Sequence, residues 1–316
     1  MDMLKKWIKR ISYTIVGIFI LLNIMAAFHA YKFTHFYSNI PPTKKTEQMS
    51  TGEKASALFF GMNYPKSKVV DSLHTTHTTV KLITNDGLQL ESWWLQQDSA
   101  KGTIVMFHGH GGSKSGIIRE AETFFAMGWN IFMTDLRAHG NSEGNICTIG
   151  ANEAMDVKAA WDFIKEKGEK KIVLYGISLG AATVMKSIND FNLQPYKVIL
   201  EMPFGTLIGA VEGRLRTMHL PEQPLSTLLA FWGGTEQGFW AFNLSPETYA
   251  KKLNCPVLLQ WGIHDQRVTE EETTVIFNNI PTQNKTLVRY TNSVHESLCK
   301  KENEKWKHST SEFLSN

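Results

Sequence analysis

Residues 171–184 read KIVLYGISLGAATV, a short apolar run followed by a serine between two glycines and then by helix-forming residues. The run 171–175 predicts a buried strand, and the small residues from 181 onward predict a helix. Between them, Gly176-Ile177-Ser178-Leu179-Gly180 fits the pattern G-x-S-x-G, in which a sharp strand-to-helix turn presents a serine hydroxyl. The glycines permit close backbone approach, and the helix N-terminus favours developing negative charge. We therefore expect Ser178 to be a nucleophile.

Strands and helices alternate on both sides of this turn. Two β-rich runs, 78–84 and 88–95, flank Asn85-Asp86-Gly87, which is a strong hairpin signal. Further strands are predicted at 103–107, 130–134, 198–201, 257–260 and 286–290, and helices at 116–127, 151–167, 179–190, 269–279 and 302–314. Short apolar runs are typical of strands that are buried on both faces of a parallel sheet. The pattern predicts an open α/β sheet with its site beyond the carboxyl ends of the strands.

A serine nucleophile needs a base, and the base needs an acid to orient it. Asp265 follows an apolar strand in the stretch WGIHD, and His295 follows the last strand in VHE. Both lie at strand ends on the edge that carries Ser178, in the chain order serine, acid, histidine. We predict a catalytic triad of Ser178, Asp265 and His295 that needs no cofactor. Glu201, at the end of another strand, is the alternative acid.

A glycine-rich turn, HGHGGS at 108–113, follows the predicted strand 103–107. Such a turn can direct a backbone N–H at an oxyanion, and we expect the N–H groups of His110 and Leu179 to form the oxyanion hole. His108 and His110 could instead bind a metal ion. No further ligands stand at a compatible spacing, so we predict no metal site.

These motifs together resemble the α/β-hydrolase superfamily, in particular its serine aminopeptidase/monoacylglycerol-lipase-like branch, which includes membrane-anchored bacterial members. The resemblance covers roughly residues 78–315. It is carried by HGHGGS at 108–113, DLRAHGNSEG at 135–144, GISLG at 176–180, WGIHD at 261–265 and VHE at 294–296. It implies the α/β-hydrolase fold, a mostly parallel central sheet flanked by helices, with the same triad and oxyanion donors. It also implies that 135–144 is mainly structural.

The stretch 205–252 is too long for an ordinary connection between a helix and a strand. In the family that the chain resembles, this position holds a helical cap over the active site. The insertion is rich in large apolar residues, of which Trp232, Phe239 and Trp240 are candidates for a substrate pocket or for a lid that leans on a membrane. Packing of the cap onto the core is an equally good interpretation of these residues.

The run 11–28, ISYTIVGIFILLNIMAAF, is uncharged and nearly long enough to cross a hydrocarbon core of roughly 30 Å. We predict a transmembrane helix at about 11–30 within an anchor of residues 1–31. A stalk with a lead-in helix is expected at 32–77, and the hydrolase domain at 78–316. A cleaved signal peptide is the alternative for the apolar run.

Positive charges precede the apolar run, at Lys5, Lys6, Lys9 and Arg10. They predict a single-pass topology with the N-terminus in the cytoplasm and the catalytic domain on the outer side. The chain has 33 basic and 30 acidic residues, and the excess of three falls within residues 1–31. The remainder is neutral overall, which argues against nucleic acid as a partner. The oligomeric state is not predicted.

Three cysteines, Cys147, Cys255 and Cys299, lie far apart and form no C-x-x-C pair. We expect isolated thiols, although one disulfide between two of them remains open.

The activity expected from these residues is hydrolysis of a carboxylic ester, through an acyl-serine, on a small-molecule or lipid-like acyl substrate. Amidases, peptidases and thioesterases use the same triad on the same fold, and they are the alternative. A peptidase would need acidic residues for a substrate amine, for which Glu201, Glu212 and Glu222 are the candidates. An alternative from another class is a non-catalytic, membrane-tethered binding protein on a hydrolase scaffold.

Overall fold

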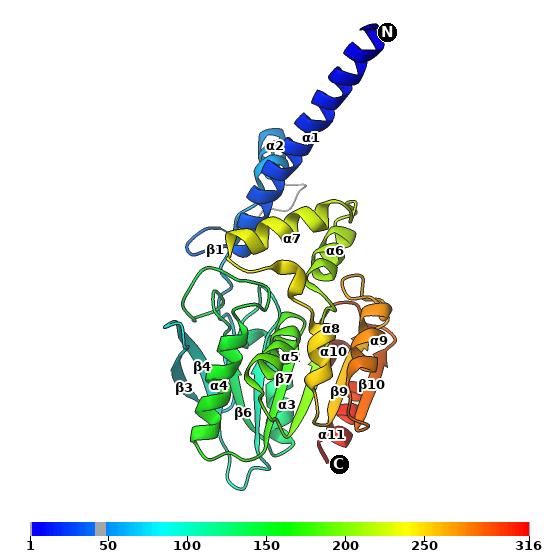
Figure 1. Ribbon diagram of the computed structural model, residues 1–316. Helices are drawn as coiled ribbons and strands as arrows, with labels where there is room; N and C mark the ends of the chain where they lie inside the picture. The colour runs from blue at the N-terminus through cyan, green and yellow to red at the C-terminus, as the bar shows by residue number, and fades with distance from the viewer. Residues whose placement is uncertain (1, 42–48, 316) are drawn as a thin grey trace.

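An eight-stranded sheet forms the centre of the computed structural model, which describes residues 2–41 and 49–315 (Figure 1). The strand order is β10-β9-β8-β7-β5-β6-β4-β3. The strands are β3 Thr78–Ile83, β4 Gln89–Leu95, β5 Thr103–Phe107, β6 Asn130–Thr134, β7 Ile172–Ile177, β8 Lys197–Glu201, β9 Val257–Gly262 and β10 Lys285–Tyr290. β4 pairs antiparallel with β3 and β6, and all other neighbours are parallel. The predicted hairpin and strands are confirmed, with ends that differ by one or two residues.

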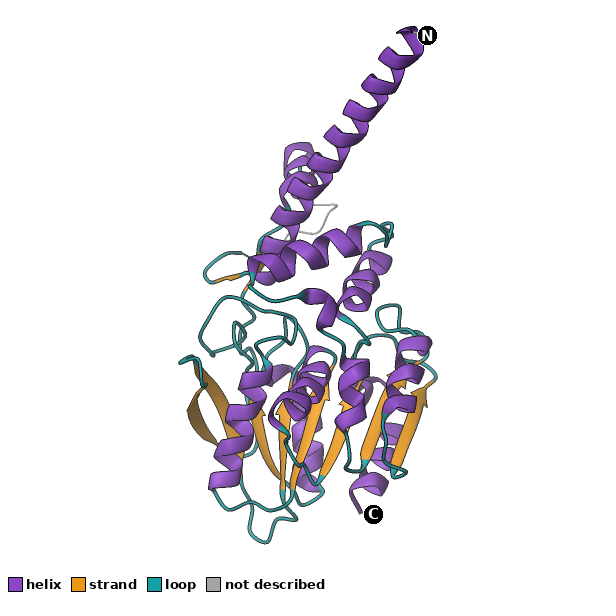
Figure 2. Cartoon of the chain, viewed as in Figure 1, coloured by secondary structure: helices purple, strands orange, loops and turns teal. Residues whose placement is uncertain are grey.

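Helices cover both faces of the sheet because the central strands are apolar on both sides (Figure 2). Along β5, Ile104 and Met106 belong to one core cluster, and Val105 and Phe107 belong to the other. The first cluster includes α3 Ile118–Ala126 and α11 Asn303–Ser315; the second includes α4 Ala154–Glu166, α5 Leu179–Phe191 and α9 Glu270–Asn279. The predicted helix at 116–127 begins with η2 Lys114–Ile117, a 3₁₀ turn, before α3, and a short helix, α10 Leu298–Lys301, precedes α11, which matches the predicted helix at 302–314.

Two helices, α6 Leu207–Thr217 and α7 Leu225–Glu236, form a cap above the carboxyl ends of the strands (Figure 1). The 3₁₀ turn η3 Ala241–Asn243 leads back to the domain. The predicted insertion is too long at its C-terminal end, because α8 Pro246–Tyr249 and η4 Ala250–Lys252 pack against α5. Their residues Tyr249 and Ala250 are buried in the core of the domain.

One long helix, α1 Asp2–Thr34, projects from the cap side of the domain (Figure 1). It is long and apolar enough to cross a membrane, with a mean hydropathy of 2.2 over its most apolar stretch. Its C-terminal half packs against α7, where Ala26 and Ala30 are buried. Trp232 Nε1 on α7 donates a hydrogen bond to Asn23 Oδ1, at 3.1 Å. The helix therefore continues beyond the predicted boundary at residue 31 and becomes part of the domain surface.

The segment predicted as a stalk lies along the domain, and residues 42–48 of it fall outside the described part of the chain. β1 Phe36–Tyr37 pairs with β2 Tyr64–Pro65, and α2 Thr51–Phe60 is the lead-in helix, which packs against α1. Phe36 and Leu73 are buried in the domain. Buried apolar side chains thus hold the described part of residues 32–77 against the domain. The three cysteines are free thiols.

Candidate active site

Ser178 lies in a strained turn between β7 and α5. Its φ of 52° and ψ of −112° are rarely adopted by residues other than glycine. A Cβ atom at Gly176 would lie 2.5 Å from the backbone of Gly180 and Ala181, and one at Gly180 would lie 2.4 Å from the carbonyl oxygen of Phe107. Both positions therefore require glycine. The turn lifts the serine hydroxyl above the sheet, as the motif predicts.

Ser178, His295 and Asp265 form one hydrogen-bonded chain. His295 Nε2 lies 2.9 Å from Ser178 Oγ, and His295 Nδ1 lies 2.7 Å from Asp265 Oδ2. The other oxygen of Asp265 accepts the backbone N–H groups of Arg267 at 2.7 Å and Val268 at 3.0 Å. These bonds fix the carboxylate so that Oδ2 faces the histidine. The geometry suits Nδ1 as the donor to Asp265 and Nε2 as the acceptor from Ser178.

The loops that carry Asp265 and His295 are joined by backbone contacts. The N–H of Ile263 donates to the carbonyl of Tyr290 at 2.9 Å, and that of His264 donates to the carbonyl of Ser293 at 3.1 Å. A Cβ atom at Gly262 would lie 2.6 Å from the Ser293 oxygen, so this approach depends on a glycine. The contacts beyond the ends of β9 and β10 thereby fix the position of Asp265 relative to His295.

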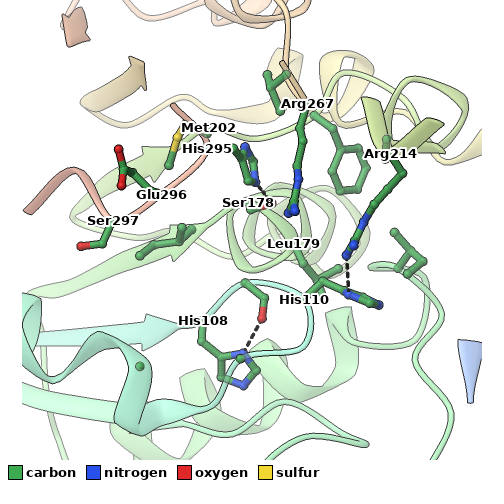
Figure 3. Close-up of a pocket in the computed structure, with 18 of the residues that line it drawn as sticks. His108, His110, Ser178, Leu179, Met202, Arg214, Arg267, His295, Glu296 and Ser297 are labelled. Atoms are coloured by element: carbon green, nitrogen blue, oxygen red, sulfur yellow. Dashed lines mark hydrogen bonds between the residues drawn. The ribbon is translucent and has the colours of Figure 1, made fainter. Parts of the chain in front are cut away.

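His110 and Leu179, the predicted oxyanion donors, line the same pocket as Ser178 (Figure 3). Among the hydrogen bonds of the described residues, neither backbone N–H has a protein acceptor. Both N–H groups are therefore available to an oxyanion above the serine.

Two buried histidines shape the oxyanion turn. His108 Nε2 accepts the N–H of Leu136 at 3.1 Å, and His139 Nε2 accepts the N–H of Gly111 at 3.0 Å. Burial lowers the pKa of both histidines, to about 3 for His139, so that they act as neutral acceptors. The stretch 135–144 thus supports the turn from below, in keeping with the structural role that the resemblance implies.

Among the pocket residues that the sequence analysis did not single out are Phe33, Arg214 and Arg267, which line a cavity of about 260 Å³. Figure 3 shows the two arginines above His110 and Ser178. The ring of Phe33 stacks on His110 with centroids 4.9 Å apart. Arg214 Nη2 donates to His110 Nδ1 at 3.0 Å. Phe33 and Arg214 come from α1 and α6, far from every motif. For Arg267, its position two residues after Asp265 was the feature of the sequence that could have placed it near the triad.

The three cap aromatics predicted for the pocket do not line it. Phe239 lines an adjoining apolar groove of about 170 Å³, which shares Phe33 and Arg214 with the pocket. Trp232 contacts α1 through Asn23, and Trp240 is 58% exposed. Of the three, Trp232 lies on α7, which packs along α1, while Phe239 and Trp240 lie in the segment that connects α7 to η3.

Glu201, the alternative acid, lies in the core and does not contact His295. Its Oε1 accepts hydrogen bonds from Tyr175 at 2.7 Å and from Trp306 at 2.6 Å. Burial, together with the nearby carboxyl of Glu120, raises the pKa of Glu201 to about 8. It therefore holds a proton at neutral pH.

The other two acidic residues considered for a substrate amine also lie outside the pocket. Glu212 accepts a hydrogen bond from Gln223, and Glu222 pairs with Arg216 at 2.9 Å. These contacts are structural ones within the cap.

The sheet order, the flanking helices, the cap and the serine turn define the α/β-hydrolase fold. Residues 98–210 match the family described as serine aminopeptidase, S33. An esterase from Pyrococcus furiosus, Pf2001, superposes with a TM-score of 0.67 at 23% identity, over 79% of this chain and 96% of the esterase. An esterase from Exiguobacterium antarcticum superposes with a TM-score of 0.58 at 16% identity, over 76% of this chain and all of that one.

Two relatives in sequence match most of the chain. The uncharacterized protein YqkD of Bacillus subtilis is 24% identical over 240 residues, which are 73% of this chain and 76% of YqkD. The uncharacterized membrane protein YNL320W of Saccharomyces cerevisiae is 25% identical over 222 residues, which are 70% of this chain and 74% of the relative. The match to the serine aminopeptidase family supports a hydrolase.

Proposed function

We propose that the protein is a serine hydrolase that cleaves carboxylic esters through an acyl-serine intermediate. The observation that carries this proposal is the continuous chain from Ser178 Oγ through His295 to Asp265, at 2.9 and 2.7 Å, beside two unused backbone N–H groups. An activated nucleophile, its base and an oxyanion hole are what acyl transfer requires.

In the proposed mechanism, Ser178 Oγ bonds to the ester carbonyl carbon while its proton passes to His295 Nε2. The oxyanion is held by the N–H groups of His110 and Leu179. His295 then returns the proton to the leaving oxygen as the bond from carbon to that oxygen breaks, and the alcohol departs. Water attacks the acyl-serine by the same route in reverse and releases the acid. Asp265 orients the imidazole and stabilises its cation.

We propose that the substrate is an acyl compound with an apolar part. The groove beside the catalytic pocket is lined by side chains of α1, α6 and α7, most of them apolar, and it meets the pocket at Phe33, Ile149 and Val211. An acyl chain would fit there, with its carbonyl at Ser178.

We extend the proposal to the membrane, with α1 as a single-pass anchor and the domain on the outer side. The basic residues before the apolar run support this orientation. The predicted span, 11–30, overlaps the part of α1 that contacts α7. Leu58 and Phe60 on α2 are exposed beside it, so the cap would rest on the bilayer surface.

Covalent labelling with a fluorophosphonate probe tests the nucleophile. Wild-type protein should label, and Ser178→Ala should abolish labelling and lower kcat for a 4-nitrophenyl ester by roughly three to six powers of ten. Ser187→Ala is a matched control, because Ser187 lies on the same helix and its buried Oγ has no hydrogen-bond partner among the described residues. Labelling of the Ser178→Ala protein would refute the assignment.

A further inference from the structure

The catalytic pocket carries two guanidinium groups that no carboxylate neutralises. Arg214 on α6 and Arg267 in the loop after β9 both line it, and Figure 3 shows Arg214 extending toward His110 and Arg267 toward Ser178. In the described part of the chain, neither side chain forms an ion pair, whereas Arg216, two residues from Arg214, pairs with Glu222. The remaining charged residue of the lining, Glu296, is exposed and points away on the far side of His295.

The fold holds these two arginines together at a cost. A Cβ atom at Gly213 would lie 2.1 Å from the carbonyl oxygen of Arg267, so α6 approaches the loop as closely as a backbone can. The N–H of Arg267 donates to Asp265 Oδ1 at 2.7 Å, which fixes this arginine relative to the triad. Arg214 is fixed through His110 at 3.0 Å. Two like charges held at a partly buried position repel each other and lose hydration.

The pKa of Arg214 reflects both its burial and the nearby positive charge. Burial, followed by the neighbouring charge of Arg267, lowers the pKa of Arg214 to about 10. Arg214 therefore remains protonated at neutral pH, and an anion placed between the two side chains would relieve the repulsion. A guanidinium pair suits carboxylate or phosphate oxygens, which accept its N–H groups in pairs.

We propose that Arg214 and Arg267 form a binding subsite for an anionic group of the ester substrate, a carboxylate or a phosphate a few atoms from the scissile carbonyl. This inference rests on the proposed ester hydrolysis at Ser178. It also disfavours a free amino group in the substrate, because the two guanidinium groups would repel an ammonium ion. The pocket has the opposite charge from the one that the peptidase alternative needs.

Matched esters test the charge preference with the full-length protein in a non-ionic detergent. On the acyl side, 4-nitrophenyl hydrogen glutarate is compared with 4-nitrophenyl pentanoate and with the ester of 4-aminobutyrate. On the alcohol side, the pentanoyl ester of 4-hydroxybenzoate is compared with that of methyl 4-hydroxybenzoate. Each kcat/KM is divided by the rate of spontaneous hydrolysis. We expect at least a tenfold preference for the anion in one of the two arms, which identifies the part of the substrate that bears the charge, and the lowest rate for the amine.

Three variants connect the preference to the arginines. Arg214→Gln and Arg267→Gln should each reduce the ratio of anionic to neutral kcat/KM at least tenfold, and Arg214→Lys should retain part of it. Arg216→Gln removes the same charge from the same helix outside the pocket and should keep the wild-type ratio. Equal rates for anionic and neutral esters in both arms, or a ratio unchanged in both glutamine variants, would overturn the subsite.

A binding measurement separates this inference from the proposed function. In the Ser178→Ala background, which leaves the ester uncleaved, calorimetry should give a Kd for the favoured anionic ester at least tenfold below that of its neutral partner. Arg267→Gln in this background should remove the difference. Equal Kd values together with fluorophosphonate labelling of wild type would refute the subsite alone. Absence of labelling and of ester turnover would refute the proposed hydrolysis, while the binding result would still decide whether the arginines bind an anion.

Discussion

At the scale of single residues, the site depends on positions where one side chain type is required. Ser178 is held at a positive φ by its neighbours, and Gly176 and Gly180 allow the backbone contacts that hold it there. Such strain persists only where the surrounding structure over-determines it. The pattern G-x-S-x-G was sufficient to predict this turn, although the contact that requires Gly180 is with Phe107 on β5.

Glu201 gives a residue-scale prediction about pH. Its pKa is raised from 4.5 to about 8, so below pH 4.5 both the folded and the unfolded states hold the proton. Between pH 4.5 and 8 the unfolded chain releases the proton more readily, so the contribution of this residue to stability is lost as the pH rises through that window.

We expect Glu201→Gln, which cannot ionise, to gain stability relative to wild type as the pH rises across this window, by at most about 1.4 kcal/mol per pH unit. Chemical unfolding of both proteins in detergent at pH 5 and pH 8 measures the change. A difference in stability between the two proteins that stays constant over this range would contradict the assignment.

At the scale of elements, the contact between α1 and α7 decides the shape of the pocket. Ala30 on α1 faces Gly233 on α7, and a Cβ atom at Gly233 would lie at an ordinary contact distance of 3.8 Å from that of Ala30. Phe33, one turn further along α1, forms part of the catalytic pocket. A substitution at this contact should therefore alter the catalytic pocket around Ser178 although the triad itself is unchanged.

We predict that Gly233→Leu lowers the free energy of unfolding by about 1–3 kcal/mol, because the larger side chain must displace α1. It should also lower ester turnover through Phe33. Gly233→Ala is the matched control and should retain wild-type turnover. Thermal unfolding and kinetics in detergent measure both effects, and identical behaviour of the two variants would show that the helices do not depend on this close contact.

At the scale of the whole molecule, α1 is both a candidate anchor and a wall of the site. A helix of 33 residues is about 50 Å long, which exceeds a hydrocarbon core of roughly 30 Å. The part that packs on the cap begins within the predicted span, at Asn23, and the helix reaches the pocket at Phe33, beyond the span. A substrate in the outer leaflet would therefore meet the groove beside α1 directly.

Fractionation tests this arrangement. We expect the full-length protein to sediment with membranes, to resist carbonate extraction and to be released by detergent. In spheroplasts of a bacterial host, the domain should be open to added protease. Soluble full-length protein without detergent would contradict the anchor, and a protected domain would contradict the predicted orientation.

The sequence by itself determined the sheet, the serine turn and the three residues that the structure brings together as Ser178, Asp265 and His295. These features depend on short apolar runs that form strands and on short motifs at the strand ends. Each run or motif consists of a few consecutive residues. Only the tertiary structure decided what surrounds them. Phe33, Arg214 and Arg267 meet because α1, α6 and the loop after β9 pack together, and packing between distant segments leaves no periodic signal in any one of them. For the same reason, the sequence did not show that Trp232 would contact α1 through Asn23.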